Sequence, residues 1–322
     1  MMPMDWYWIL LIVLTVTVVL PVIGSATIVP PIVFDAVLKR SRPDKWSRDV
    51  CSDPKNEGIV YMWNESLRFR EKYAENEVEL SAVTEDGLHL EALYYDFGSD
   101  TAVIILPGRP EPCIYSLYYA FPYAEKKVNV LAMDVRSHGL SEGTYSGCGY
   151  MEQFDVLAYI KLLEERGVKR IILHGVCVGS SIASFVAARP DCPASVKAII
   201  TDGLYVHFYE TLKRRIAQKK GMVYPAIFYF RHRIKKMYGT DILKEGPIVN
   251  VTKFRIPCLM MASKEDIFSL PKKTQKLFNL NASPEKELVW FEHGPHSHLR
   301  RVDTEKYDSC VNKMIEKVAN RD

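Results

Sequence analysis

The amino-terminal part of the chain is one long apolar run. Residues 6–34 contain no charged side chain, and a helix of this length is about long enough to cross a bilayer. Trp6, Tyr7 and Trp8 open the run, where membrane-spanning helices carry an interfacial aromatic belt. The pattern predicts a single membrane anchor over residues 1–36.

Two other interpretations fit the apolar run less well. A cleaved secretory signal would end in small residues such as Gly24-Ser25-Ala26, but it would also begin with basic residues, and the opening MMPMD has none. A buried helix of a soluble protein would need a polar face, which the run lacks.

Basic residues follow the anchor directly in a predicted linker over residues 37–54, and none precedes the anchor. This asymmetry favours a single-pass protein whose remaining chain is cytoplasmic. The same side chains could also lie on anionic lipid headgroups. They are Lys39, Arg40, Arg42, Lys45 and Arg48.

Alternating apolar and polar positions appear next. Residues 78–83 and 88–95 each alternate with a period of two, and Glu85-Asp86-Gly87 stands between them. An acidic-glycine turn between two such runs predicts an antiparallel hairpin.

Short, continuous apolar runs then replace the alternation. Such runs, bounded by Gly, Pro or charged residues and separated by helical patterns, are typical of buried parallel strands with helices on both faces. The fold class predicted is therefore α/β, a mostly parallel, doubly wound sheet with an antiparallel start. The runs cover residues 101–106, 128–134, 170–175, 196–202, 257–263 and 287–292.

One intervening helix is clear, over residues 151–167. Its apolar residues recur at helical spacing, and Gly167 ends it. These apolar residues are Phe154, Leu157, Ile160 and Leu163.

A longer stretch, over about residues 204–250, is helical in tendency and rich in aromatic and basic residues. It is too long for a simple crossover, so we expect a helical cap inserted over the carboxyl edge of the sheet, where open α/β sheets bind ligands. A solvated helix with a basic face and an amphipathic surface resting on the membrane are the alternatives. With this cap, residues 55–322 form one predicted domain.

Composition excludes several classes of function. The net charge of +3 is too small to indicate a nucleic-acid partner. The seven cysteines are an odd number and show no CxxC or Cys/His spacing, which argues against a disulfide framework or a zinc site. No metal or organic cofactor is expected.

The stretch HGVCVGSS, residues 174–181, contains the candidate nucleophile. Cys177 lies between Gly175 and Gly179, after a predicted strand and before a helix rich in small residues. A glycine-flanked nucleophile in this context indicates the strand-turn-helix elbow of one large class of hydrolases. The glycines are required because the turn is cramped and neighbouring backbones approach closely.

From about residue 75 to residue 318, the chain resembles the α/β-hydrolase superfamily, and within it membrane-anchored bacterial α/β-hydrolase-like proteins. Besides the elbow GVCVG, ILPGR (105–109) resembles the oxyanion loop of the family, with Pro107 where the family has histidine. The segments MDVRSHGLSEG (133–143) and EKELVWFEHGPH (285–296) resemble the D-x-R-G-x-G-x-S-x-G segment and the strand and loop that deliver the catalytic histidine.

The resemblance implies a catalytic acid after the strand over residues 257–263. Asp266 in SKEDIFSLP fits this place when counted from the strand. Counted back from Pro271 it is one place off, and Glu265 is the alternative. Asp202, at the end of an earlier strand, is a third position.

The resemblance also implies a catalytic histidine in the loop after the last strand. His293, His296 and His298 all lie there. His296 falls where the family places its histidine, and His298 is the next candidate.

Together these residues imply a Cys-His-Asp triad. Cys177 would attack a carbonyl as a thiolate, His296 would exchange the proton, and Asp266 would orient the imidazole. The backbone N–H groups of Val178 and Arg109 would bind the oxyanion. Pro107 lacks an N–H, but it does not remove either of these main-chain donors.

The function implied is hydrolysis of ester, thioester or amide bonds. A thioester intermediate also reacts with amines and thiols, so acyl transfer is an alternative, and a non-catalytic protein that binds a ligand or partner in the inherited cleft is another. The expected partners are a small-molecule or lipid-like acyl substrate and the membrane. Arg136, His138 and Glu142 are expected to hold the fold rather than the substrate.

Overall fold

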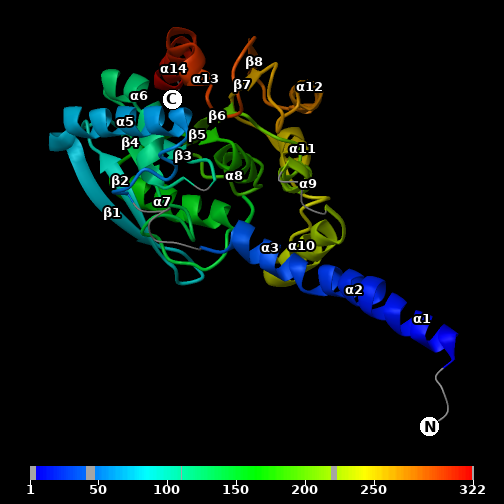
Figure 1. The fold of residues 1–322 in the computed structure, drawn as a ribbon. Helices are drawn as coiled ribbons and strands as arrows, with labels where there is room; N and C mark the ends of the chain where they lie inside the picture. Colours follow the sequence, from blue (N-terminus) through cyan, green and yellow to red (C-terminus); the bar gives the residue numbers. More distant parts are fainter. Residues whose placement is uncertain (1–4, 41–47, 110, 219–222, 321–322) are drawn as a thin grey trace.

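The structure is a computed structural model that describes residues 5–40, 48–109, 111–218 and 223–320 (Figure 1). A rounded α/β body is built around a twisted sheet. A long helix at the amino-terminal end projects away from this body.

The described residues form one eight-stranded sheet in the order β1-β2-β4-β3-β5-β6-β7-β8. β1 pairs with β2, and β2 with β4, in antiparallel fashion, whereas the remaining neighbours are parallel. Each apolar run of the sequence has become a strand, so the predicted mostly parallel sheet with an antiparallel start is confirmed. The strands are β1 (Glu77–Val83), β2 (His89–Tyr95), β3 (Thr101–Leu106), β4 (Asn129–Met133), β5 (Arg170–Val176), β6 (Val196–Asp202), β7 (Cys258–Ser263) and β8 (Lys286–Phe291).

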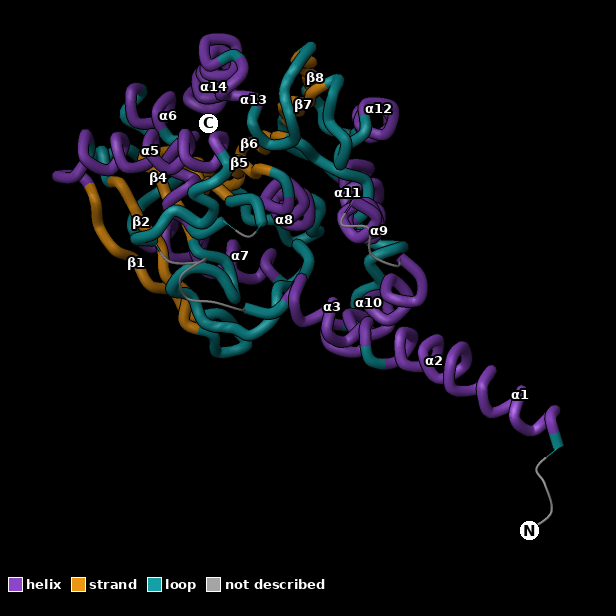
Figure 2. Tube along the Cα trace, in the orientation of Figure 1, coloured by secondary structure: helices purple, strands orange, loops and turns teal. Residues whose placement is uncertain are grey.

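Helices cover both faces of the sheet (Figure 2). Side chains alternate along the buried strands, so Ile104 enters the core shared with α7 and α8, whereas Val103 and Ile105 enter the core shared with α5, α6 and α14. The remaining elements before the cap are α1 (Trp6–Leu14), the π-helix η1 (Thr15–Val19), α2 (Leu20–Thr27), α3 (Val29–Leu38), α5 (Glu57–Lys72), η2 (Ala74–Asn76), η3 (Cys113–Tyr119), α6 (Phe121–Glu125), α7 (Glu152–Glu165) and α8 (Val178–Ala187).

The predicted helix over residues 151–167 is α7, and Gly167 follows it with φ +89°. Its buried face differs from the expected one. Ile160 and Leu163 are buried as predicted, but Phe154 and Leu157 are only half-buried. Their places facing the core are taken by Val156 and Tyr159, and by buried polar residues near the amino end of the helix that bind the preceding loop.

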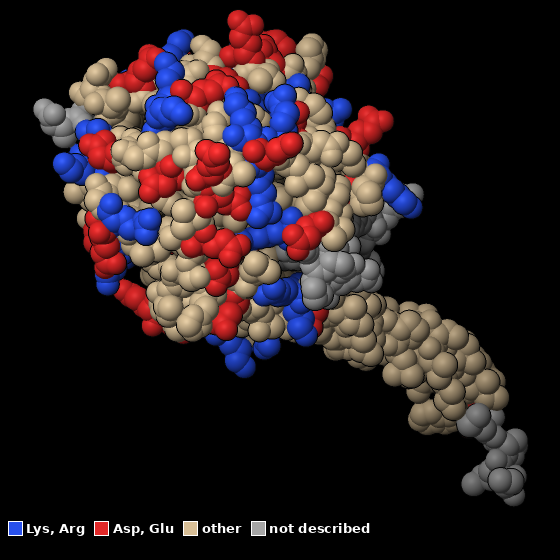
Figure 3. All heavy atoms as spheres, turned by 90° about the vertical axis from the view of Figure 1, so that its left-hand side faces the viewer, with Lys and Arg blue, Asp and Glu red and all other residues tan. Residues whose placement is uncertain are grey.

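The amino-terminal apolar run is a continuous helical segment, Trp6–Leu38, which is long and apolar enough to cross a membrane. Its side chains are exposed or half-exposed up to Val29, and on the face drawn in Figure 3 it is a rod without Lys, Arg, Asp or Glu. Pro30, Phe34 and Leu38 are buried. The last turns of the predicted anchor are therefore part of the folded domain.

The basic residues after this helix partly bind the domain instead of forming a free linker. The Arg40 guanidinium donates to the carbonyls of Ser141 and Gly139 at 2.6 and 2.5 Å. Arg48 is buried and forms an ion pair with Asp134 at 3.0 Å. Arg42 and Lys45 lie outside the described residues.

Three helices occupy the predicted cap between β6 and β7, and residues 219–222 of this stretch lie outside the described ones. Within α10, Tyr224 has an extended backbone, so the regular helix begins at Pro225. α10 packs against α3, and α11 packs near α8. The elements from the cap onwards are α9 (Phe208–Gln218), α10 (Val223–Tyr238), α11 (Pro247–Asn250), η4 (Val251–Lys253), α12 (Pro271–Leu280), α13 (Leu299–Val302) and α14 (Thr304–Ala319).

Candidate active site

Cys177 forms the turn between β5 and α8 in a backbone conformation that is rare for a residue with a side chain. Its φ is +54° and its ψ is −113°. Such strain costs about 1–3 kcal/mol and is retained mainly where function needs it. The conformation is that of a nucleophile elbow, which presents the side chain at the carboxyl edge of the sheet.

The two glycines around Cys177 allow the elbow to close. A Cβ on Gly175 would lie 2.3 Å from the carbonyl oxygen of Gly179, and a Cβ on Gly179 would lie 2.0 Å from that of Leu106. Any larger residue would force the strand and helix apart. The close approach predicted from the sequence is confirmed.

The elbow is also bonded to the neighbouring strand. The Cys177 N–H donates to the carbonyl of Asp202 at 2.9 Å, and the Ser180 hydroxyl reaches the same carbonyl at 2.9 Å. These two hydrogen bonds fix the position of Cys177 relative to the carboxyl end of β6.

His296 and Asp266 come together from the loops after β8 and β7. His296 Nδ1 lies 2.6 Å from Asp266 Oδ2, and both side chains are largely buried. The other Asp266 oxygen accepts the backbone N–H groups of Phe268 and Ser269 at 2.7 and 2.8 Å. This network holds one carboxylate oxygen toward the imidazole.

The electrostatics of the pair follow from these contacts. Burial acts to lower the pKa of His296, but the Cys177 thiolate charge and the bond to Asp266 outweigh it and hold that pKa well above its usual range. Burial likewise acts to raise the pKa of Asp266, and His296 outweighs it, so the pKa of Asp266 is lowered. The environment favours a charged imidazolium beside the Asp266 carboxylate.

His296 Nε2 is the atom that would exchange a proton with the nucleophile. It is buried and has no hydrogen bond of good geometry among the described residues. Cys177 is nevertheless close enough to raise the pKa of the imidazole. Catalytic hydrogen bonds are often long before substrate binds.

The alternative acid and base line the same cavity as Cys177 but have other contacts. Glu265 accepts a hydrogen bond from the exposed His293 at 3.1 Å. Burial lowers the pKa of His298, which lies at the start of α13. Among the three histidines it is His296 that meets Asp266 in this structure.

Asp202 lies at the end of β6, fully buried. Neither carboxylate oxygen has a hydrogen bond of good geometry to a described residue. Burial raises the pKa of Asp202 to about 7, with the charge of His296 acting in the opposite direction. Asp202 is thus a second carboxylate near His296, but it is not bonded to the ring.

The candidate oxyanion loop runs over the elbow. A Cβ on Gly108 would lie 3.5 Å from the Cys177 Cβ, so the loop passes close to Cys177. Val178 is the first residue of α8, where a helix leaves backbone N–H groups unpaired. Val178 and Arg109 therefore lie on the two segments that flank Cys177, and their role as oxyanion donors stays a prediction.

A cavity of about 1230 Å³ opens at this edge of the sheet. Cys177 and His296 line it, together with side chains that the sequence did not single out. Glu111 follows the oxyanion loop, and burial raises its pKa to about 7. The residues missed are Ser52, Asp53, Pro54, Lys55, Asn56, Ile59, Glu111, Arg215, Ile267, Phe268, Pro295 and Ser297.

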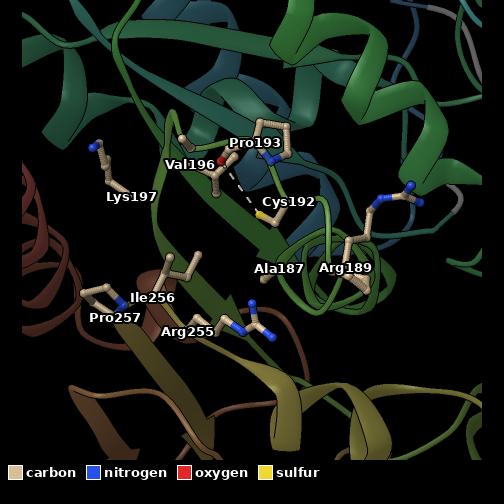
Figure 4. Close-up of a pocket in the computed structure, with 11 residues that line it drawn as sticks. Ala187, Arg189, Cys192, Pro193, Val196, Lys197, Arg255, Ile256 and Pro257 are labelled. Atoms are coloured by element: carbon tan, nitrogen blue, oxygen red, sulfur yellow. Dashed lines mark hydrogen bonds between the residues drawn. The ribbon is translucent and has the colours of Figure 1, made fainter.

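A second cavity, of about 450 Å³, lies at the opposite end of α8 (Figure 4). Its lining includes Cys192, Arg189 and Arg255, and also the first residue of β6, Val196. It therefore lies at the amino ends of the parallel strands, whereas open α/β sheets bind ligands at the carboxyl ends. The candidate nucleophile and base do not reach it.

The polar residues expected to hold the fold do so. Arg136 donates to Asp155 at 2.8 Å and to Asp86 at 2.9 Å. The Glu142 side chain accepts the N–H of His89 at 2.9 Å. No group of three or more metal-ligating side chains occurs in the part of the chain that the structure describes.

A family model described as the alpha/beta hydrolase fold matches residues 101–235. An uncharacterized protein of Bacillus subtilis, YqkD, is 25% identical over 217 residues, which cover 66% of this chain and 70% of YqkD.

Solved structures share the fold. The esterase Pf2001 of Pyrococcus furiosus superposes with a TM-score of 0.63 at 22% identity, over 77% of this chain and 95% of its own. An esterase of Exiguobacterium antarcticum, EaEST, superposes with a TM-score of 0.55 at 17% identity, over 73% and 98% of the two chains.

Proposed function

We propose that this chain is a hydrolase of the α/β-hydrolase superfamily and that it cleaves ester, thioester or amide bonds through Cys177, His296 and Asp266. The observation that carries the proposal is the 2.6 Å contact between His296 Nδ1 and Asp266 Oδ2 beside a strained cysteine elbow. The esterases among the structural neighbours favour an ester as the first substrate to test.

The first half of the reaction acylates the cysteine. The Cys177 thiolate attacks the carbonyl carbon of the substrate and forms a tetrahedral oxyanion. When this intermediate collapses, the bond to the leaving group breaks, and the His296 imidazolium gives its proton to the departing alkoxide, thiolate or amine. The products are a Cys177 thioester and a neutral imidazole.

The second half releases the acid. Water gives a proton to His296 as its oxygen attacks the thioester, and collapse expels the Cys177 thiolate beside the regenerated imidazolium. An amine or thiol in place of water would give acyl transfer with the same balance of atoms. Asp266 keeps Nδ1–H bonded, so Nε2 faces the reacting atoms in both halves.

The backbone N–H groups of Val178 and Arg109 are proposed to bind the oxyanion. Donors of this kind typically contribute about 10²–10³ in kcat each. The close approach of the oxyanion loop to Cys177 supports this assignment.

The surroundings of the enzyme are part of the proposal. We assign the exposed part of the apolar helix, residues 6–29, as a single membrane span with the catalytic domain on the cytoplasmic side, and the substrate as a small-molecule or lipid-like acyl compound. Neither a nucleic-acid partner nor a cofactor enters the mechanism.

The test is an acyl-trapping experiment on the full chain in detergent with p-nitrophenyl esters. Wild type is expected to release p-nitrophenol and to carry the acyl group on Cys177, located by peptide mass spectrometry. Cys177→Ala should abolish both, whereas Cys192→Ala, a matched change of a half-buried cysteine in the second cavity, should retain both. Acyl-Cys177 that only amines or thiols discharge would indicate a transferase, and no acylation would indicate a binding protein.

A further inference from the structure

The end of the apolar helix is packed against the cap. The Phe34 ring on α3 contacts Tyr229 and Phe230 of α10, with ring centroids 5.9 and 5.0 Å apart. Asp35 accepts the Tyr145 hydroxyl at 3.0 Å, and Arg40 binds the carbonyls described above. The end of the helix is therefore packed against both α10 and the loop before α7, and α3 and α10 lie side by side (Figure 1).

This packing fixes how far α10 lies from a membrane. At about 1.5 Å per residue, the helix rises about 42 Å from Trp6 to Phe34. A bilayer is about 40–45 Å thick when both headgroup layers are included. With Trp6 in the far headgroup layer, Phe34 and the part of α10 that packs on it lie at the near one.

The free face of α10 suits that position. Tyr224 and Phe228 are 50% and 58% exposed, and their rings pack together with centroids 5.2 Å apart. His232, Lys235 and Lys236 are exposed further along the helix. The sequence of α10 contains no acidic residue. Aromatic and basic side chains on one face are typical of helices that lie in the interface of anionic bilayers.

The preceding helix extends this face and reaches the catalytic cavity. The Lys213 ammonium of α9 lies 5.5 Å from the centre of the Tyr224 ring. Two residues later, Arg215 lines the cavity that contains Cys177. The cap thus connects the proposed membrane-facing surface with the active site.

We propose that α10 is an interfacial helix that lies on an anionic phospholipid bilayer through Tyr224 and Phe228, and that the cavity receives its acyl substrate from lipids of that bilayer. The first part rests on the proposed membrane span and on the packing of α3 against α10. The second part rests on the proposed function.

The first experiment measures contact with lipid. The full chain is placed in nanodiscs of phosphatidylcholine and phosphatidylglycerol with brominated acyl chains, and the fluorescence added by Phe228→Trp is taken as the difference from wild type. We expect bromine to quench this added emission at least twofold. Val302→Trp is the matched control, because Val302 is 45% exposed on α13, away from α3, and should stay unquenched. Equal quenching of the two variants would overturn the interfacial helix.

The second experiment separates the two parts of the proposal. A Tyr224→Ser, Phe228→Ser variant leaves the catalytic residues intact, so its rate on a soluble short-chain ester should match wild type, while its rate on a phospholipid ester in the same nanodiscs should fall about tenfold or more. If the variant loses the same fraction of the wild-type rate on both substrates, or loses no activity on either, the role of the cap surface is overturned. If wild type is inactive on both esters, the proposed function is refuted. The fluorescence experiment would still show whether α10 contacts the bilayer.

Discussion

Gly203 and His296 are fitted to one another. A Cβ on Gly203 would lie 2.8 Å from Cε1 of the His296 ring. Gly203 also has φ +69°, which residues with side chains rarely adopt. The residue after β6 must therefore be glycine for the imidazole to reach its place above Cys177.

Gly203→Ala is expected to lower kcat/KM about tenfold or more, because displacing the imidazole by a fraction of an ångström misaligns it with the nucleophile. Steady-state kinetics on the ester of the acyl-trapping experiment measure the change. Gly87→Ala is the matched control, since Gly87 also has a positive φ of +86° but no atom lies within 4 Å of its added Cβ. Both variants should lose about 1–2 kcal/mol of stability, and only Gly203→Ala should lose activity. Equal activity in the two would mean that the clash does not matter.

Asp266→Asn is expected to lower kcat by about 10²–10⁴, because an amide can neither fix the Nδ1–H tautomer nor stabilise the imidazolium. Glu265→Gln should remain within about twofold of wild type, since Glu265 contacts the exposed His293 instead. If Glu265→Gln lowers kcat more than Asp266→Asn does, the catalytic acid is Glu265 instead of Asp266.

Asp202→Asn should change the pH dependence of stability. The pKa of Asp202 is about 7 in the folded chain and about 3.9 when unfolded. Between these values the folded state keeps a proton that the unfolded state releases, so this residue lowers the free energy of unfolding as pH rises from about 4 to 7. Relative to wild type, Asp202→Asn should therefore gain on the order of 1–4 kcal/mol between pH 4 and pH 8. Thermal unfolding in detergent at both pH values measures this gain, and a difference from wild type that is the same at both would contradict it.

Glu111→Gln should change activity only at higher pH. Glu111 lies against Gly108 of the oxyanion loop, with Oε2 2.9 Å from the point where a Cβ would stand. Because its pKa is about 7, wild type acquires a negative charge beside the oxyanion as pH rises through 7, which opposes the charge of the transition state. Glu111→Gln should match wild type at pH 6 and exceed it severalfold at pH 8.5. A variant slower than wild type at pH 8.5 would show instead that the carboxylate assists the reaction.

The fold could be predicted from the sequence because its signals are local. Short apolar runs bounded by glycine, proline or charge became the strands, and the Glu85-Asp86-Gly87 turn became the hairpin. The elbow was equally visible, since only glycine fits at positions 175 and 179. A match to the family pattern placed His296 and Asp266 in loops that the structure brings together.

The rest depends on contacts between distant segments. Glu111 and Arg215 enter the cavity from loops and helices whose positions no local pattern specifies. Phe34 packs on α10 although the two are almost 200 positions apart in the sequence. The sequence therefore predicted that the end of the apolar helix lies in the membrane, whereas part of it lies in the protein core. The helical spacing predicted that Phe154 and Leu157 face the core. The buried face of α7 instead includes polar residues at the start of the helix, which leaves Phe154 and Leu157 half-buried.

The most direct test of the central claim is alkylation of Cys177 in the full chain by iodoacetamide as a function of pH, read by peptide mass spectrometry in wild type, His296→Ala and the control His293→Ala. The account predicts that wild type and His293→Ala keep nearly the same rate at pH 6 as at pH 8, because the imidazolium stabilises the thiolate, whereas His296→Ala loses about a hundredfold over this range as a free thiol does. A wild-type Cys177 that loses the same factor, or that does not react at any pH, would contradict a thiolate–imidazolium pair and with it the proposed hydrolase.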